Sequence, residues 1–427
     1  MADYTTSSVF GIARDVPLNY VTREEVDGLL IDSLTRDKHL VIYGSSKQGK
    51  TCLRKHCLQE DDYITVTCTN RWDVGELQGA ILKSSGYRLE LGQTKTISGQ
   101  QMVSATIGVK LGIPGFGEIG GQVGGEDGEG ETTQTSTAKL ELDIYDVNDI
   151  IGALDNIGFR KYIVLEDFHY LPIEVQKDFA IALKAFHEGS DLCFIVVGVW
   201  LEENRLIQFN GDLTGRVIAI NADKWSREEL REVISVGESL LNVKLDEAFA
   251  KDLIDGAFES VSIVQESCYK LCTSAGIHQT QKEPAQVGFG LDARSLVKDV
   301  VDAQSGRYLA FITNFATGFQ ETRLEMHKWL LYLVLTSTSE ELEEGLRLTS
   351  IAKAIRSKHS ETKLNPGNVT QALQSAASLQ VKKGTIPIIL DYDQTNTRLN
   401  VVDRGFLIWL TYQKREELLA AADLPIN

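Results

Sequence analysis

The stretch "VIYGSSKQGKTCL", from Val41 to Leu53, limits the possible folds of this chain more than any other part of the sequence. An apolar segment, residues 40–43, leads into Gly-Ser-Ser-Lys-Gln-Gly-Lys-Thr, and the residues that follow can begin a helix. This is the strand–GxxxxGK[ST]–helix order of a phosphate-binding P-loop. Gly44 and Gly49 allow the tight turn that points backbone N–H groups at a phosphate, with a helix N-terminus behind them. The sequence therefore predicts an α/β fold in which a P-loop follows a strand of a parallel sheet with helices on both faces.

The positions of this loop have distinct expected roles in holding a nucleotide. Lys50 is expected to reach the β- and γ-phosphates, and the Thr51 hydroxyl to take one position on Mg²⁺. ATP and Mg²⁺ are the expected cofactors, although the loop itself does not separate ATP from GTP. The predicted nucleotide-binding residues of the loop are Gly44, Ser45, Ser46, Lys47, Gln48, Gly49, Lys50, Thr51 and Cys52.

Length and composition exclude several classes of protein. The length of 427 residues predicts two or three domains. The formal net charge of −17 argues against a protein whose whole surface binds nucleic acid, but a local basic face remains compatible with it. Six cysteines without CxxC spacing predict core thiols rather than disulfides or a zinc site. The N-terminus lacks a basic region followed by an apolar stretch, and no apolar run reaches about twenty residues, so we expect a cytoplasmic protein.

A second element of the nucleotide site is predicted in "KYIVLEDFHYL", where the apolar segment Tyr162–Leu165 is followed by Glu166 and Asp167. The carboxyl ends of parallel strands meet at the edge of the sheet that carries the P-loop. One carboxylate is thus expected in the Mg²⁺ shell and the other beside the attacking water, and the sequence leaves open which does which. The alternative is an acidic pair that caps a helix after a core strand.

The order of the later motifs resembles the AAA+ superfamily. A buried strand, "LCFIVVGVW", is followed by Leu-Thr-Gly-Arg before a short strand, and then by Ser-Arg-Glu-Glu at a helix start. Within the superfamily, residues 20–277 are similar to the branch of origin-recognition and helicase-loader ATPases, transposition-adaptor ATPases and STAND signalling ATPases.

That resemblance implies roles for residues outside the P-loop. The segment that contains Tyr20 and Val21 would pack near the adenine. Arg216 would be an arginine finger that completes the site of a neighbouring subunit, which implies a homo-oligomer. The alternative for Arg216 is an ordinary ion pair with a surface carboxylate, and Arg205 is the second candidate for the finger.

Three departures from the AAA+ pattern favour a slow, nucleotide-gated switch over a fast motor. The carboxylates stand in the order Glu-Asp instead of Asp-Glu. The third strand ends in Gly198, Val199 and Trp200, without a polar sensor side chain. The helical lid lacks the Arg of a second sensor, and Gln265 is the nearest polar substitute.

An insertion over residues 94–145 interrupts the ATPase core. Apolar and polar residues alternate from Val103 to Ile113 and again from Ala138 to Ile144, on either side of a glycine-rich acidic tip. This period of two predicts a long β-hairpin. Its apolar face requires a partner, for which the alternatives are the ATPase core, a second protein or copy, and a membrane.

The expected domains are the ATPase core (1–225), a helical lid (226–285) and a helical linker with a winged helix (286–427). Helices over 326–337, 348–359 and 369–383, followed by a strand pair, resemble a winged helix. Its basic residues make duplex DNA an expected partner, whereas protein interaction is the alternative. The candidate DNA-contacting residues are Lys353, Arg356, Lys358, Lys363, Lys382 and Lys383.

These features give two hypotheses of function. The first is an ATP-binding, slowly hydrolysing, oligomeric AAA+/STAND-like switch that regulates a multi-protein system such as bacterial antiphage defence. Because no nuclease, protease or TIR-like constellation is visible, its effector would be a separate protein. The alternative is a DNA-binding AAA+ initiator, helicase loader or transposition adaptor.

Overall fold

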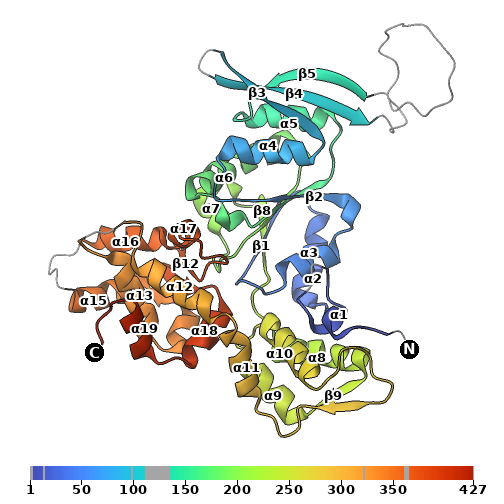
Figure 1. The fold of residues 1–427 in the computed structure, drawn as a ribbon. Coiled ribbons are helices and arrows are strands. Elements are labelled where there is room, and N and C mark those ends of the chain that lie inside the picture. The colour runs from blue at the N-terminus through green and yellow to red at the C-terminus, as the bar shows by residue number, and fades with distance from the viewer. Residues whose placement is uncertain are drawn as a thin grey trace.

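The computed structural model describes residues 3–12, 15–97, 100–110, 135–320, 323–359 and 365–426, with backbone alone for 88–97, 100–110 and 135–141. Its centre is a five-stranded sheet in which every pair is parallel (Figure 1). Because the strands are parallel, their carboxyl ends meet at one edge, where β1 runs into the P-loop and β6 ends at Glu166. In spatial order the strands are β2 (Tyr63–Thr67), β6 (Tyr162–Glu166), β7 (Phe194–Val197), β1 (His39–Tyr43) and β8 (Val217–Asn221).

Helices cover both faces of this sheet. Val41 and Tyr43 of β1 pack in the cluster that contains α4 (Val74–Ser84), α5 (Val147–Asn156) and α6 (Ile173–Gly189). The alternate residues Leu40 and Ile42 pack in the cluster that contains α2 (Glu24–Leu34) and α3 (Lys50–Cys57). Strands buried on both faces read as continuous apolar runs, which is why the segments before the P-loop and before Glu166 lack polar residues. The predicted α/β fold with helices on both faces is confirmed.

The predicted hairpin is part of a three-stranded antiparallel sheet with the order β3 (Tyr87–Ile97), β4 (Gln100–Lys110) and β5 (Thr135–Leu142). The β4–β5 pairing, from Val103 opposite Leu142 to Lys110 opposite Thr135, agrees with the prediction, whereas β3 was not predicted. The sheet therefore begins before residue 94. The described part of the chain does not include residues 111–134, which contain the last predicted strand positions and the acidic tip. It also does not include the side chains of the alternating face up to residue 141. In Figure 1 this sheet lies beside α4 and α5, at the end of the molecule away from the lid.

The lid consists of α8 (Arg227–Leu241), α9 (Glu247–Gly256) and α10 (Val261–Ser274), with a parallel pair of β9 (Val243–Leu245) and β10 (Ala285–Val287). Helix α1 (Thr6–Phe10) packs on it. A Cβ on Gly237 would lie 2.2 Å from the Phe10 ring, so glycine is required for this contact. The N-terminal segment is thereby held against the lid, close to the segment of Tyr20.

The C-terminal region contains a three-stranded sheet with the order β11 (Leu346–Arg347), β13 (Arg398–Val401) and β12 (Leu390–Asp393). The strand pair expected from the sequence is β12–β13, and β11 is additional. The helix expected over 369–383 is two helices, because the chain turns at Ser375, whose hydroxyl donates to the Gln371 carbonyl and contacts His327. The helices are α11 (Ala293–Asp302), α12 (Ser305–Ala316), α13 (Met326–Thr336), α14 (Ser339–Glu344), α15 (Leu348–Lys358), α16 (Pro366–Gln374), α17 (Ala376–Lys382), α18 (Arg404–Thr411) and α19 (Arg415–Ala421).

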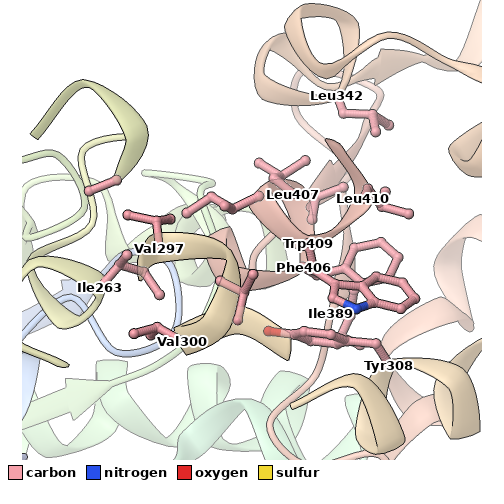
Figure 2. Close-up of a cluster of buried hydrophobic side chains, with 14 of the residues drawn as sticks. Ile263, Val297, Val300, Tyr308, Leu342, Ile389, Phe406, Leu407, Trp409 and Leu410 are labelled. Carbon is pink, nitrogen blue, oxygen red and sulfur yellow. The ribbon is translucent and has the colours of Figure 1, made fainter. Parts of the chain in front are cut away.

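One hydrophobic cluster joins the lid to the C-terminal region. Figure 2 shows Ile263 of α10 and Val297 of α11 beside residues of α12 and α18. The buried ring of Tyr308 lies 5.4 Å from that of Phe406 and 5.2 Å from that of Trp409, measured between ring centroids. Continuous burial across both regions means that the C-terminal region cannot move far without moving the lid helices. Within the described ranges, no helix has both the length and the apolar character needed to cross a membrane.

The amino edge of the sheet provides a test of the fold by pH. His39 accepts from the Phe194 N–H at 3.2 Å and contacts the Leu183 carbonyl at 2.9 Å, and burial lowers its pKa to about 4. The unfolded chain therefore binds the proton between pH 6.5 and about 4 and the folded chain does not, so stability falls as the pH falls through this window. We expect His39 to account for about 3 kcal/mol of that loss.

Urea unfolding of the wild type and of His39→Gln at pH 7 and pH 4.5 measures this effect. Glutamine keeps a donor and an acceptor but does not titrate, so the stability of the variant should fall less. Equal losses in the two proteins would contradict the assignment.

Candidate nucleotide-binding site

A cavity of about 340 Å³ opens at the carboxyl edge of the sheet. The P-loop and the β6 carboxylates line one end, and Tyr20 with α8 and α10 of the lid lines the other. The predicted residues that line it are Tyr20, Val21, Ser46, Lys47, Gln48, Gly49, Lys50, Thr51, Cys52, Glu166 and Asp167. The remaining two, Gly44 and Ser45, lie behind it and contact the chain after β8. Segments far apart in the sequence thus form one elongated site. One end of this site is polar and the other is apolar.

The two P-loop glycines occupy positions whose backbone conformation favours glycine. Gly44 has a φ of +148°, and a Cβ there would lie 2.9 Å from the Asp223 Cα; Gly49 has a φ of +83°. Lys50 is buried and its Nζ donates to the Gly44 carbonyl at 2.9 Å and to the Ser45 carbonyl. Burial lowers the pKa of Lys50 to about 8, although the negative charges of the nearby carboxylates raise it in part. An incoming phosphate would offer this ammonium a charged partner in place of neutral carbonyls.

The P-loop is bonded to the lid. The Gln48 side chain donates to the Glu259 carbonyl at 3.3 Å and accepts from the Val261 N–H at 3.4 Å, at the start of α10. The Trp225 indole donates to the Gln48 carbonyl at 3.3 Å. These bonds make the position of the lid depend on the conformation of the loop.

The P-loop is also bonded to the C-terminal region. The Ser46 N–H donates to the Val402 carbonyl at 2.8 Å, and the Lys47 ammonium to the Gln304 side chain at 3.3 Å. Pro387 lines the nucleotide cavity. Val199, at the end of β7, packs with Val402 in a separate buried cluster. The C-terminal region is therefore docked on the nucleotide site and forms part of its wall.

A buried ion pair joins these three parts. Asp223 accepts from the Ser45 N–H at 2.6 Å and from Arg404 at 2.7 Å, and Arg404 also donates to the Phe258 carbonyl of the lid at 3.1 Å. Burial alone would raise the pKa of Asp223, but the guanidinium and the Ser45 bonds hold it below its usual value. Asp223 was not predicted from the sequence, although a carboxylate two residues after strand β8 lies at the same sheet edge as Glu166.

The two β6 carboxylates have different surroundings. Glu166 accepts from Arg54 at 2.9 Å, and the buried Arg54 guanidinium lies over the Tyr63 ring. Asp167 has a left-handed backbone with a φ of +58°, and burial together with the Glu166 charge raises its pKa. A cation thus already neutralises part of the charge at the expected metal position. Arg54 was not identified from the sequence, although it follows Lys50 by one helical turn.

The end of β7 is filled by an aromatic side chain. Trp200 is fully buried, and a Cβ on Gly198 would lie 1.6 Å from its ring. Arg205, at the start of α7 (Arg205–Phe209), lies over the Trp200 ring and forms ion pairs with Asp391 at 2.6 Å and Glu202 at 3.3 Å. Arg205, the second candidate for a finger, is therefore buried between the core and the C-terminal region of its own chain.

At the other end of the cavity, Gln265 forms a reciprocal amide pair with Asn19, with N···O distances of 2.9 and 2.8 Å. This pair links the lid to the N-terminal segment. Within the described part of the chain, Gln265 forms no hydrogen bond with the P-loop. The neighbouring Tyr20 hydroxyl donates to Asp27 at 2.6 Å, which fixes the ring beside the cavity.

Arg216 lies at the amino end of β8, the edge of the sheet opposite the P-loop. Its carbonyl accepts from the His39 N–H at 3.0 Å, and its guanidinium pairs with Glu188 at 2.7 Å. The side chain is half-buried. From this edge Arg216 cannot serve its own P-loop, so any role as a finger is in another subunit.

The candidate DNA-contacting residues are divided between two places. Lys353 and Arg356 are exposed on α15, where Lys358 donates to the Tyr332 hydroxyl at 2.7 Å. At the end of α17, Lys382 lies over the Phe319 ring and Lys383 donates to Thr317 at 3.0 Å. Lys363 lies outside the described residues.

The helix expected to enter a DNA groove faces the ATPase core in this structure. Gln374, Ser378 and Lys382 line a cavity of about 350 Å³ whose opposite wall includes Tyr170 and Arg205. The β12–β13 turn is held as well, because Thr395 donates to Glu202 through its N–H at 3.2 Å.

Comparisons with known proteins bear on the fold. No family model matches this chain, and no curated protein matches it. Among solved structures, the Walker-type ATPase of Pyrococcus abyssi is similar over 94% of this chain and 99% of its own, at 12% identity and a TM-score of 0.51. The fold is that of a Walker-type ATPase. This result and the sheet order confirm the predicted α/β P-loop fold.

Two further structures have lower TM-scores. The ORC2 protein of Aeropyrum pernix is similar over 97% of this chain and 96% of its own, at 12% identity and a TM-score of 0.47. A STAND protein of Pyrococcus horikoshii is similar over 94% of this chain and 44% of its own, at 13% identity and a TM-score of 0.37.

The tight contact at the end of β7 gives a prediction about stability. Gly198→Ala would force a methyl group into the Trp200 ring, and we expect a loss of about 3 kcal/mol in the free energy of unfolding. Gly152→Ala on α5 is the matched control, because its Cβ meets open space and should stabilise the helix by about 0.5–1 kcal/mol. Urea unfolding measures both, and equal stability of the two variants would contradict the packing.

Proposed function

We propose that this protein is an ATP-binding, Mg²⁺-dependent P-loop ATPase that acts as a switch, with its C-terminal region docked on the nucleotide site in one state and released in the other. The observation that carries the proposal is the bonding of three nearby P-loop residues to separate parts of the chain. Ser45 bonds to the core, Ser46 to the C-terminal region and Gln48 to the lid. A ligand can shift such an equilibrium when it binds one arrangement more tightly than the other.

The residues present suit a nucleotide triphosphate. The buried Lys50 ammonium has only backbone carbonyls as hydrogen-bond partners among the described residues, and the cavity extends from it to the apolar surroundings of Tyr20. Thr51, Glu166 and Asp167 would hold Mg²⁺, an ion that prefers oxygen ligands. The Arg54–Glu166 pair and the apolar end of β7 support slow hydrolysis.

Oligomeric assembly is the proposed output of the switch. Arg216 lies at the edge opposite its own P-loop. Its guanidinium pairs with Glu188 and donates to the Asp212 carbonyl, and such surface contacts are worth little to stability. As a finger in a neighbouring subunit it would couple hydrolysis to assembly. A regulatory role in a multi-protein system, of which antiphage defence is one example, follows if a separate effector recognises the assembled form.

The second candidate is a DNA-binding initiator, loader or adaptor. The exposed Lys353 and Arg356 on α15 support this candidate. The order of α15, α16, α17 and the β12–β13 pair supports a winged helix. In the docked state α17 faces the ATPase core, so DNA binding through that helix would require release. Salt-dependent binding of duplex DNA that rises with ATP would favour this candidate.

Assembly is tested by mass photometry and ATP hydrolysis with Mg-ATP, with and without duplex DNA. We expect the wild type to assemble with ATP, Lys50→Ala to lose nucleotide binding and assembly, and Arg216→Ala to lose hydrolysis by about a hundredfold or more. Arg160→Ala is the matched control, because Arg160 is another surface arginine paired with a carboxylate. Normal hydrolysis by Arg216→Ala would rule out the finger.

Docking is tested through Arg404. Arg404→Leu removes the bonds to Asp223 and to the lid, and we expect release of a fluorescent ADP analogue to become about tenfold faster, the effect of 1.4 kcal/mol. Arg398→Leu is the matched control, because Arg398 bonds to carbonyls of Glu344 and Gly345 within the C-terminal region. Identical release rates in the two variants would show that docking does not control the nucleotide.

A further inference from the structure

His169 is a buried histidine to which the sequence analysis assigned no role. It belongs to the short 3₁₀ turn Phe168–Tyr170, two residues after Asp167, and is 6% exposed. The residue lines the nucleotide cavity and also the cavity shared by the core and the C-terminal region. His169 therefore lies between the nucleotide site and the surface on which α17 is docked.

Neither ring nitrogen of His169 has a hydrogen-bond partner among the described residues. A buried polar atom without a partner is costly and rare in folded proteins. The contrast is His39, equally buried at the opposite edge of the sheet, where both nitrogens are bonded to backbone groups. Both nitrogens are also closed to solvent, so the ring must turn toward the nucleotide cavity before a ligand there can pair with it.

The position of the ring indicates which part of the ligand it meets. Strands β6 and β7 are neighbours in the sheet, so the turn after β6 lies beside the end of β7. Gly198 and Val199, at that end, line the same cavity without offering a polar side chain. His169 is a polar residue at this edge and lines the same cavity as Asp167 and Lys50.

We propose that His169 is the sensor of the terminal phosphate and that one of its ring nitrogens donates a hydrogen bond to a γ-phosphate oxygen of bound ATP. This inference rests on the proposed ATP binding. ADP lacks that phosphate and leaves the ring unpaired, so His169 discriminates between the two nucleotides. His169 also lines the cavity that contains Arg205 and Asp391, whose ion pair joins core and C-terminal region. The residue that distinguishes ATP from ADP therefore lies next to the interface between the core and the C-terminal region.

The test compares affinities for a non-hydrolysable ATP analogue and for ADP in the full-length protein by calorimetry. For His169→Leu we expect about a tenfold or greater loss of analogue affinity, the effect of a hydrogen bond to a charged group, with ADP affinity unchanged within about twofold. His169→Gln keeps a donor and should retain more of the ATP preference. His187→Leu, a histidine on α6 outside the nucleotide cavity, should bind both nucleotides as the wild type does.

The outcomes separate this inference from the proposed function. Equal analogue-to-ADP affinity ratios in the wild type and in the Leu and Gln variants would overturn the sensor assignment while leaving nucleotide binding intact. Equal losses of both nucleotides in His169→Leu would overturn it too, because they indicate a structural role. A wild type that binds neither nucleotide would defeat the proposed function itself. If His169→Leu does not fold, His169→Phe retains an aromatic ring without a donor and carries the same expectation.

Discussion

The candidate nucleotide site depends on one buried carboxylate, that of Asp223. It accepts from the P-loop at Ser45 and from Arg404, which also holds the lid through the Phe258 carbonyl. Removing one partner of a buried ion pair leaves an uncompensated charge and typically costs about 3–5 kcal/mol. An arginine of the C-terminal region thus stabilises the arrangement of a loop more than 350 residues earlier in the chain.

The other contacts of the site explain why this arrangement suits a switch. Ser46 and Gln48 are bonded to different parts of the chain, and the hydrophobic cluster of Figure 2 makes the lid and the C-terminal region one packed unit. Movement of the P-loop around a phosphate chain would strain several of these bonds at once. Packed interfaces tend to have discrete alternative arrangements rather than continuous ones. These contacts therefore support the proposed switch between two states.

The sequence predicted the parts of the molecule whose signals are local. The P-loop, the β6 carboxylates and the hairpin pairing follow from residue spacing within short segments. Strand β3 was missed because its register shifts between Glu90 and Thr94, which breaks the period of two. The break at Ser375 was missed because no glycine or proline marks it.

The missed site residues have a common physical reason. Asp223, Arg54 and His169 are defined by groups that come together only in the fold: Asp223 bonds to Ser45 and Arg54 to Glu166, each over more than a hundred residues. His169 is defined by the absence of a partner among the described residues, which a sequence does not reveal. Asp223 follows the last strand of the parallel sheet, so its place at the same edge as Glu166 was predictable from the position of that strand.

The central claim is that docking of the C-terminal region is coupled to the nucleotide. Pulsed EPR between spin labels at Asp61, on the exposed turn before β2, and Arg356, on α15, measures this coupling directly. We predict one narrow distance distribution with ADP and a second, clearly different population with a non-hydrolysable ATP analogue. A single unchanged distribution with no nucleotide, ADP and the analogue, under conditions where calorimetry shows both nucleotides bound, would contradict the account.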